Sequence, residues 1–164
     1  MRQLRPHLYF GPSVQPVELP RLRRTGITAV LSLQEPGPDL PAAAMDRMRA
    51  ACAPGIRFVN VAIADYDPFA LVERLPAALD ALDELHRDGR VVYVHCSAGI
   101  NRAPSLALAY LVRREGLAVD VALAALYAAD AGVLPYDEVL HWLQRGTDAP
   151  ARPRMGRAGA EEDG

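Results

Sequence analysis

The sequence predicts a single α/β domain whose central, mostly parallel sheet is flanked by helices. Short apolar runs typical of buried strands alternate with longer segments in which leucines recur at helical spacing. The chain has 164 residues, of which 51% are hydrophobic and 23% charged, enough for one substantial core. In such a fold we expect the ligand-binding loops at the carboxyl ends of the strands.

The strands and helices are expected to alternate along most of the chain. Predicted strands are His7–Phe10, Ile27–Leu33, Ile56–Ile63 and Val91–Val94. Predicted helices are Pro41–Cys52, a leucine-rich segment from Phe69 or Leu71 to Asp88-Gly89, Ser105–Glu115, Val119–Ala129 and Tyr136–Arg145. A short polar segment around 19–24 should present its arginines to solvent. The domain is expected to span residues 1–146, followed by a disordered tail over 147–164, which is rich in Gly, Pro, Ala and charge.

The most informative segment is 95–105, which reads HCSAGINRAPS. Cys96 and Arg102 stand six positions apart, between a strand-like run and a helix-like run. A strand, a tight loop of backbone amides and a helix N-terminus together form an anion site. A cysteine in that positive field favours its thiolate, and an arginine at the end of the loop can hold a phosphate through two hydrogen bonds. This arrangement suits nucleophilic attack by cysteine on a phosphoester.

Two other residues in the segment fit the same loop. Gly99 provides a position for a positive φ angle. Pro104 lacks an N–H, which is tolerated in the first helical turn, so the helix should start near Arg102. The alternative interpretation is that Cys96 is an inert buried thiol after a core strand.

The segment HCSAGINRAPS resembles the signature of cysteine-dependent dual-specificity phosphatases, a branch of the protein tyrosine phosphatase superfamily. The resemblance extends from about Leu4 to Leu143 and implies a protein tyrosine phosphatase-like fold. It implies that Cys96 is the nucleophile and Arg102 the phosphate clamp. The phosphate cradle implied is formed by the backbone amides of Ser97, Ala98, Gly99, Ile100, Asn101 and Arg102. No metal and no cofactor are expected, because the loop supplies the charge that a metal would bring.

His95, directly before the nucleophile, has two interpretations. The resemblance implies that it orders the loop and helps to hold down the pKa of the cysteine. Alternatively it is a core histidine whose polar atoms bond to the backbone.

A phosphatase of this kind also needs a proton donor for the leaving oxygen. The stretch Asp65-Tyr66-Asp67 follows the apolar run 56–63 and precedes the leucine-rich helix. The resemblance places the acid at Asp65, with Asp67 as the second candidate. The alternative is that both carboxylates cap the helix that follows.

One position departs from most relatives. Where they carry a Ser or Thr after the arginine, this chain has Ala103, and Ser105 lies two residues further on. The Arg-Ala-Pro variant resembles the plant-type glucan phosphatases. Further similarity to that branch lies in Asp65-Tyr66-Asp67, Arg74-Leu75-Pro76-Ala77, Val92-Tyr93-Val94-His95, Arg5-Pro6-His7-Leu8 and Leu31-Ser32-Leu33-Gln34.

The substrate class stays open at this point. Glucan sites hold sugars on aromatic platforms, yet only 6% of this chain is aromatic and the segment Gly37–Met48 has none. Tyr66, Phe69 and Tyr136 are candidates for a pocket mouth or for core packing. The interior of the 95–102 loop has no lysine, which argues against polyanionic phosphoinositides. We therefore expect a phosphoprotein substrate, with a phosphoglucan as the alternative.

Two other functions compete with this reading. A rhodanese-type sulfurtransferase also carries a cysteine on an anion-binding loop, although it has no need of Asp65. An inactive phospho-ligand binding module would usually have lost Cys96 or Arg102, and Ala103 is the one feature in its favour.

The remaining composition sets limits on partners and compartment. The net charge of −2 and the pI near 6.1 give no reason to expect nucleic-acid binding. No apolar run reaches membrane-spanning length and the N-terminus does not resemble a signal peptide, so we expect a cytoplasmic protein without membrane contact. Two cysteines are too few for a disulfide framework, and Cys52 is either a small buried hydrophobe or a resolving thiol for Cys96. The oligomeric state is not determined by the sequence.

Overall fold

The computed structural model describes residues 1–145, so the predicted tail over 147–164 lies outside the described part. The strands are β1 (Arg2–Arg5), β2 (Leu8–Gly11), β3 (Ala29–Ser32), β4 (Arg57–Asn60) and β5 (Val92–His95). The helices are the 3-10 turn η1 (Pro16–Glu18), α1 (Leu19–Arg24), α2 (Ala42–Cys52), α3 (Pro68–Arg87), α4 (Arg102–Arg113), α5 (Val119–Ala129) and α6 (Asp137–Arg145). The predicted α/β class is confirmed.

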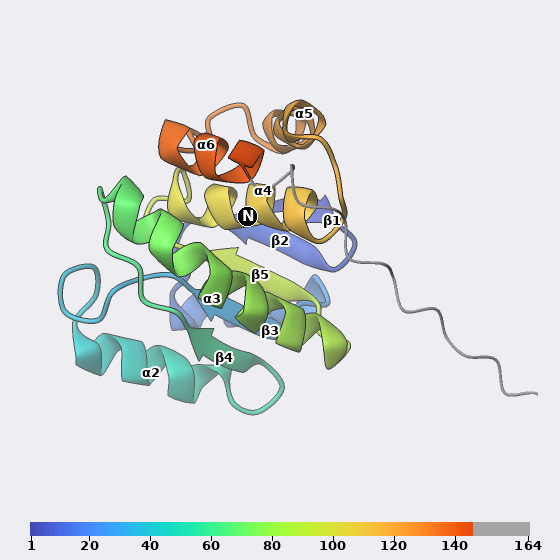
Figure 1. The fold of residues 1–164 in the computed structure, drawn as a ribbon. Helices are drawn as coiled ribbons and strands as arrows, with labels where there is room; N and C mark the ends of the chain where they lie inside the picture. Colours follow the sequence, from blue (N-terminus) through green and yellow to red (C-terminus); the bar gives the residue numbers. More distant parts are fainter. Residues whose placement is uncertain (146–164) are drawn as a thin grey trace, which may run out of the picture.

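The five strands form one sheet in the order β1-β2-β5-β3-β4. β2, β5, β3 and β4 pair in parallel, while β1 pairs antiparallel with β2 at the edge. The strand that leads into the HCSAGINR segment, β5, is therefore central, with β2 on one side and β3 on the other. Figure 1 shows α2 at one end of the molecule and α5 and α6 at the other.

The two faces of the sheet pack against different layers, as the alternation of side chains along each strand requires. On β5, Val92 and Val94 belong to the core under α3, α4, α5 and α6, whereas Tyr93 belongs to the core under α1 and α2. On β3, Leu31 and Val30 divide in the same way. Both faces of the central strands are thus covered, which is typical of parallel sheets.

Helix α4 is the most deeply buried helix of the fold. Ten of its residues are buried, including its first, Arg102, and its small residues face neighbours on more than one side. A helix that is apolar on nearly all sides belongs inside a domain. The position of Arg102 is consequently fixed by the core and not by a surface loop.

Several sequence predictions are confirmed and some bounds were wrong. The helix start at Arg102 and the helix end at Asp88-Gly89, where Gly89 has a φ of 71°, agree with prediction. The strand predicted over 56–63 is shorter, since only 57–60 pair with β3 and the chain then turns toward α3. β1 was not predicted, because its polar sequence RQLR lies at the sheet edge with only Leu4 buried.

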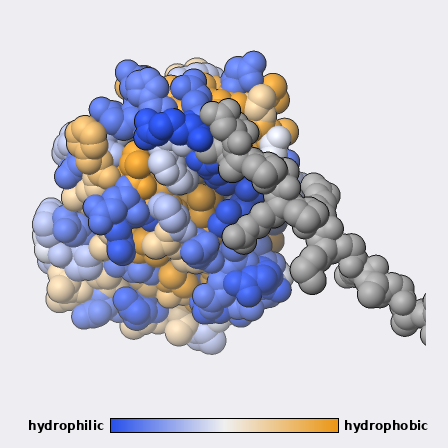
Figure 2. Space-filling model, in the orientation of Figure 1, coloured by the Kyte–Doolittle hydropathy of each residue, from blue (hydrophilic) through white to orange (hydrophobic). Residues whose placement is uncertain are grey.

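The surface of the described part carries interspersed hydrophilic and hydrophobic side chains (Figure 2). The arginines of α1 are exposed, as predicted, while its leucines are buried. No helix within residues 1–145 is long and apolar enough to cross a membrane.

Candidate active site

The register of the sheet brings the ends of the four parallel strands into one row. Gly11 of β2 pairs with His95 of β5, His95 pairs with Ser32 of β3, and Ser32 pairs with Asn60 of β4. The segments that follow these residues all leave the sheet at the same edge. The site is therefore assembled from loops that are up to about 90 residues apart in sequence, as expected for a parallel sheet.

Cys96 lies at the entrance of the loop between β5 and α4. Its side chain is buried, and its Sγ accepts a hydrogen bond from the backbone N–H of Gly99 at 3.3 Å. This amide, together with the N-terminus of α4, stabilises negative charge on the sulfur. The loop thus curls back over the thiol, as the spacing of Cys96 and Arg102 predicts.

Gly99 is required by both its backbone angle and its surroundings. Its φ is +75°, as predicted for this position. A Cβ atom there would lie 2.3 Å from the backbone nitrogen of Pro12 and 2.4 Å from the carbonyl carbon of Gly11. The loop packs directly on the backbone that follows β2, so any side chain at this position would force the two segments apart.

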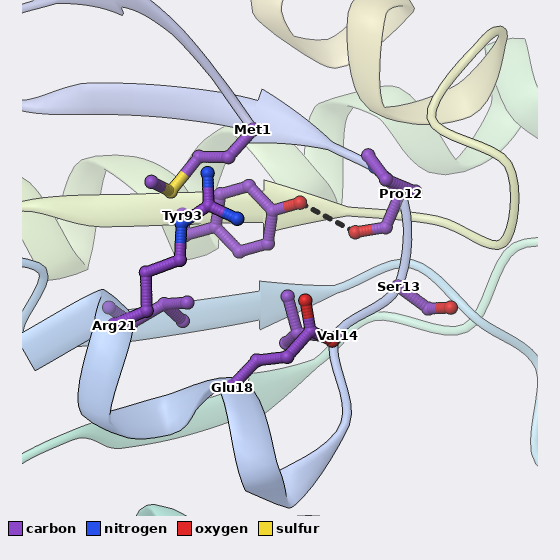
Figure 3. Close-up of a pocket in the computed structure, with 8 residues that line it drawn as sticks. Met1, Pro12, Ser13, Val14, Glu18, Arg21 and Tyr93 are labelled. Carbon is purple, nitrogen blue, oxygen red and sulfur yellow. Dashed lines mark hydrogen bonds between the residues drawn. The ribbon is translucent and has the colours of Figure 1, made fainter.

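The segment after β2 packs against the loop between β5 and α4 and is hydrogen-bonded to it. The N–H of Ser13 donates to the carbonyl oxygen of Ser97 at 3.0 Å. The hydroxyl of Tyr93 donates to the carbonyl oxygen of Pro12 at 2.5 Å, as Figure 3 shows. Burial raises the pKa of Tyr93 well above its usual range, which keeps this hydroxyl a donor. Tyr93 therefore ties the central strand to the segment on which Gly99 rests.

Arg102 is almost fully buried, and its guanidinium is surrounded by oxygen atoms. Nη1 donates to the carbonyl oxygen of Ile63 at 2.8 Å and to Oδ2 of Asp39 at 2.5 Å. Nη2 donates to Oδ2 of Asp65 at 2.6 Å and to the hydroxyl of Ser97 at 3.1 Å. Burial by itself would lower the pKa of Arg102, but the hydrogen bond to Asp39 and the nearby negative charges raise it instead. Arg102 is thus a fixed cation.

Asp39 was missed by the sequence analysis. It lies in the segment between β3 and α2, 63 residues before Arg102, and its side chain is only 9% exposed. Burial would raise the pKa of its carboxyl, but hydrogen bonds from Arg102 and from the N–H of Glu35 outweigh burial and hold the pKa below its usual value. No local pattern marked this residue, since a single aspartate after two prolines is typical of a turn.

The structure separates the two candidate acids. Asp67 is the N-cap of α3 and accepts hydrogen bonds from the N–H groups of Phe69 and Ala70. Asp65 does not cap the helix; its carboxylate contacts Arg102 and accepts a hydrogen bond from the N–H of Tyr66 at 3.0 Å. Tyr66 has a φ of 58°, which non-glycine residues rarely adopt, and such conformations cluster at functional sites.

His95 is buried beside the site. Its Nδ1 lies 3.1 Å from the carbonyl oxygen of Cys96, and its ring stacks on Tyr93. Burial lowers the pKa of His95 to about 4, so the imidazole is neutral near pH 7. Because the carbonyl can only accept, Nδ1 carries the hydrogen. His95 thus contributes a hydrogen bond to the backbone of Cys96 but no positive charge.

The side chains of Ala103 and Ser105, which follow Arg102, donate no hydrogen bond to the thiol of Cys96. Ala103 is buried and has no hydroxyl. Ser105 is also buried, and its Oγ has no hydrogen-bond partner among residues 1–145, Cys96 included.

Cys52 is buried in the core on the opposite face of the sheet, where burial raises its pKa. A raised pKa favours the unreactive thiol, which fits a small hydrophobe better than a resolving cysteine.

Exposed apolar side chains flank the loops that carry Asp65 and Cys96. Tyr66 and Phe69 follow Asp65, and Ile100 lies on the 96–102 loop. The exposed Leu134 is tied to that loop, since its N–H donates to the carbonyl oxygen of Ile100 at 2.8 Å. Within the described residues, no group of three or more His, Cys, Asp or Glu side chains is placed to hold a metal ion.

This geometry can be compared with known proteins. A sequence model of the family described as "Dual specificity phosphatase, catalytic domain" matches residues 8–147. The chain belongs to the dual-specificity phosphatase family. Its fold agrees with that assignment: the structure of Tk-PTP in the active form superposes with a TM-score of 0.75, covering 90% of this chain and 95% of that one at 24% identity.

Two curated relatives illustrate the range of this dual-specificity phosphatase family. The amyloplastic phosphoglucan phosphatase DSP4 of Castanea sativa is 36% identical over 119 residues, which is 69% of this chain and 32% of the relative. Dual specificity protein phosphatase 12 of Mus musculus is 30% identical over 120 residues, 73% of this chain and 33% of the relative. The chain thus spans about a third of the length of these relatives. The similarity to the glucan phosphatase branch predicted from the motifs is confirmed.

Proposed function

We propose that this chain hydrolyses phosphomonoesters through a phosphocysteine intermediate without a metal, as a dual-specificity-type protein phosphatase. One observation carries the proposal: Cys96 and Arg102 lie at the two ends of a single loop, and the Gly99 amide of this loop donates to the thiol. The backbone amides of residues 97–102 and the N-terminus of α4 supply the positive field that the three equatorial oxygens of the transferring phosphoryl group need.

In the first step, the Cys96 thiolate attacks phosphorus while the bond from phosphorus to the leaving oxygen breaks. The leaving oxygen takes a proton from Asp65, so the alcohol departs neutral. In the structure, Oδ2 of Asp65 contacts Nη2 of Arg102. We infer that the phosphoryl group takes over this contact and releases the carboxyl toward the leaving oxygen.

In the second step, water attacks the phosphorus of the phosphocysteine. Asp65 accepts a proton from the water, the bond from sulfur to phosphorus breaks, and inorganic phosphate leaves. The electron pair returns to Cys96, whose Sγ is stabilised by the N–H of Gly99. Because Ala103 cannot donate a further hydrogen bond to the sulfur, this step is expected to be the slower one.

A phosphoglucan is the second candidate substrate, and two observations favour it. The relative from Castanea sativa carries that activity in its name and is 36% identical to this chain. Two of the exposed side chains beside the site, Tyr66 and Phe69, carry uncharged rings that can lie against a sugar.

The mechanism also bears on the compartment. The nucleophile has to remain a free thiol, and both cysteines of the chain are free in the structure. We infer that the protein works in a reducing compartment, with the cytoplasm as the proposed location.

The experiment that tests the function is a turnover assay of the purified protein. The substrates are an aryl phosphate, a phosphotyrosine peptide, a phosphoserine peptide, a phosphoglucan and a phospholipid, with thiosulfate plus cyanide as the sulfurtransferase assay. We expect phosphate release from the aryl phosphate and from a phosphopeptide. Release from the phosphoglucan alone among the biological substrates would select the second candidate, and thiocyanate formation without phosphate release would contradict both.

A further inference from the structure

We propose that Asp39 is a positioning residue, which holds the Arg102 guanidinium so that its Nε and Nη2 edge faces the phosphoryl group. The inference rests on the proposed function, since it assigns a role within the same site. Asp39 lies outside the 95–105 segment, on the loop between β3 and α2.

The contact is an end-on pair between a carboxylate and a guanidinium. Oδ2 of Asp39 lies 2.5 Å from Nη1 of Arg102, and Oδ1 lies 3.3 Å from Nη2. Arginine donates along two usable edges, one formed by Nη1 and Nη2 and the other by Nε and Nη2. Asp39 occupies the first edge. Among residues 1–145 the buried Nε of Arg102 has no hydrogen-bond partner, so the second edge is open at Nε.

The hydrogens of Nη1 are taken up by protein oxygens. Besides Asp39, Nη1 donates to the carbonyl oxygen of Ile63 at 2.8 Å and approaches that of Leu33 at 3.5 Å. Ile63 and Leu33 follow β4 and β3, so these contacts fix the position of the guanidinium relative to the sheet. Nη1 therefore has no hydrogen left for a phosphate. Within the described residues Nε is free, and the contact from Nη2 to Asp65 is the one that the proposed mechanism transfers to the phosphoryl group, so a phosphate should bind through Nε and Nη2.

Asp39 is itself rigidly held. Its Oδ2 accepts a hydrogen bond from the N–H of Glu35 at 2.8 Å, and its own N–H donates to the carbonyl oxygen of Glu35 at 3.1 Å. Its Oδ1 accepts from the hydroxyl of Ser97 at 3.2 Å, and that hydroxyl accepts from Nε2 of Gln34. The network therefore joins three parts of the site, namely the loop after β3, the hydroxyl of Ser97 at the start of the 97–102 loop, and the guanidinium.

Positioning and simple electrostatics give opposite expectations. Removing a negative charge beside the site should strengthen the binding of an anion if Coulomb attraction alone mattered. If Asp39 positions Arg102, its removal should weaken anion binding, because the guanidinium loses the geometry of two parallel hydrogen bonds. The sign of the change in affinity separates the two roles.

The test measures tungstate, an oxyanion of phosphate shape, binding to the full chain by calorimetry, together with kcat and KM for an aryl phosphate. Asp39→Asn keeps the size of the side chain and removes its charge. Asp46→Asn is the matched control, since Asp46 lies on the surface of the neighbouring helix α2. We expect the Kd of tungstate to rise about tenfold or more and kcat/KM to fall roughly 10²-fold in Asp39→Asn, with both unchanged in Asp46→Asn.

An unchanged or lower Kd in Asp39→Asn would overturn the proposal and mark Asp39 as a competitor of phosphate. Should Asp39→Asn not fold, Asp39→Ala is measured with the same two expectations. Asp39→Glu, which restores the charge, should recover part of the lost kcat/KM, and no recovery would count against positioning. If the wild type bound tungstate without hydrolysing any phosphoester, the proposed function would fail while the calorimetry still decided the role of Asp39.

Discussion

Oδ2 of Asp65 lies 2.6 Å from Nη2 of Arg102, so the proposed acid rests on the cation that is to hold the phosphoryl group. The contact joins the loop before α3 to the first residue of α4. Asp65 is thereby in direct contact with the residue that ends the loop from Cys96. The same guanidinium also contacts Asp39, so two carboxylates from different loops converge on one buried arginine.

Replacing Asp65 by Asn should slow substrates with poor leaving groups far more than activated aryl esters. General acid catalysis contributes roughly 10²- to 10⁴-fold, and an activated alcohol does not need it. The measurement is kcat/KM on an alkyl phosphate and on a nitrophenyl phosphate. Asp67→Asn is the control, since asparagine caps a helix about as well as aspartate, so this variant should stay folded and show no dependence on the leaving group. The reverse pattern in the two variants would move the role to Asp67.

Gly99→Ala should disrupt the loop, and Gly116→Ala provides a matched control. Both glycines have a φ of +75°, but a Cβ at Gly116 meets nothing within 4 Å, whereas at Gly99 it meets the backbone of Gly11 and Pro12. The conformational penalty is shared, at about 1–2 kcal/mol. Gly99→Ala should lose about 1–3 kcal/mol more from overpacking, together with tungstate binding. Equal free energies of unfolding for the two variants would contradict the close packing described.

Ala103→Ser should speed the hydrolysis of the phosphocysteine. The added hydroxyl can donate to the departing thiolate, a charge-assisted hydrogen bond of about 1.5–3 kcal/mol at most. Rapid-quench kinetics on an activated aryl phosphate should show a burst in the wild type and a smaller burst in the variant. A wild type without a burst would show that the first step limits turnover or that another group already assists the sulfur.

His95 should make the protein less stable in mild acid. Burial lowers its pKa from 6.5 to about 4 in the folded state, so below pH 6.5 the unfolded chain binds a proton that the folded chain does not. Stability is unaffected by this residue above that pH and falls by about 3 kcal/mol as the pH drops toward 4. Urea unfolding of His95→Asn should show a smaller loss between pH 7 and 4.5 than the wild type. The exposed His141→Asn is the control, and an identical loss in all three proteins would be inconsistent with a buried neutral imidazole.

The sequence was sufficient for the features that depend on local chemistry. The strand, loop and helix around 95–105 follow from an apolar run, a glycine and a proline, and Gly99 and the helix start at Arg102 were predicted on that basis. The assignment of Asp67 as a cap and Asp65 as the contact to Arg102 needed the structure, since both residues precede the same helix. Two carboxylates this close in sequence cannot be given different roles until their hydrogen-bond partners are known.

Features that depend on distant pairing were not predictable. The polar edge strand β1 forms because β2 offers a free edge, which no hydrophobic periodicity reveals. Asp39 follows β3 and Arg102 follows β5, and the two residues meet because these strands are neighbours in the sheet. In the sequence, α2, β4 and α3 lie between the two strands. Residues of this kind become visible only when the order of the strands is known.

The central claim, nucleophilic catalysis by Cys96, is tested most directly by the turnover of Cys96→Ser on an aryl phosphate. We expect hydrolysis to be abolished while tungstate binding stays measurable, because the loop amides and Arg102 remain in place. Cys52→Ser is the control, since it removes the other thiol, on the far face of the sheet, and should retain turnover. Wild-type turnover in Cys96→Ser would contradict the mechanism.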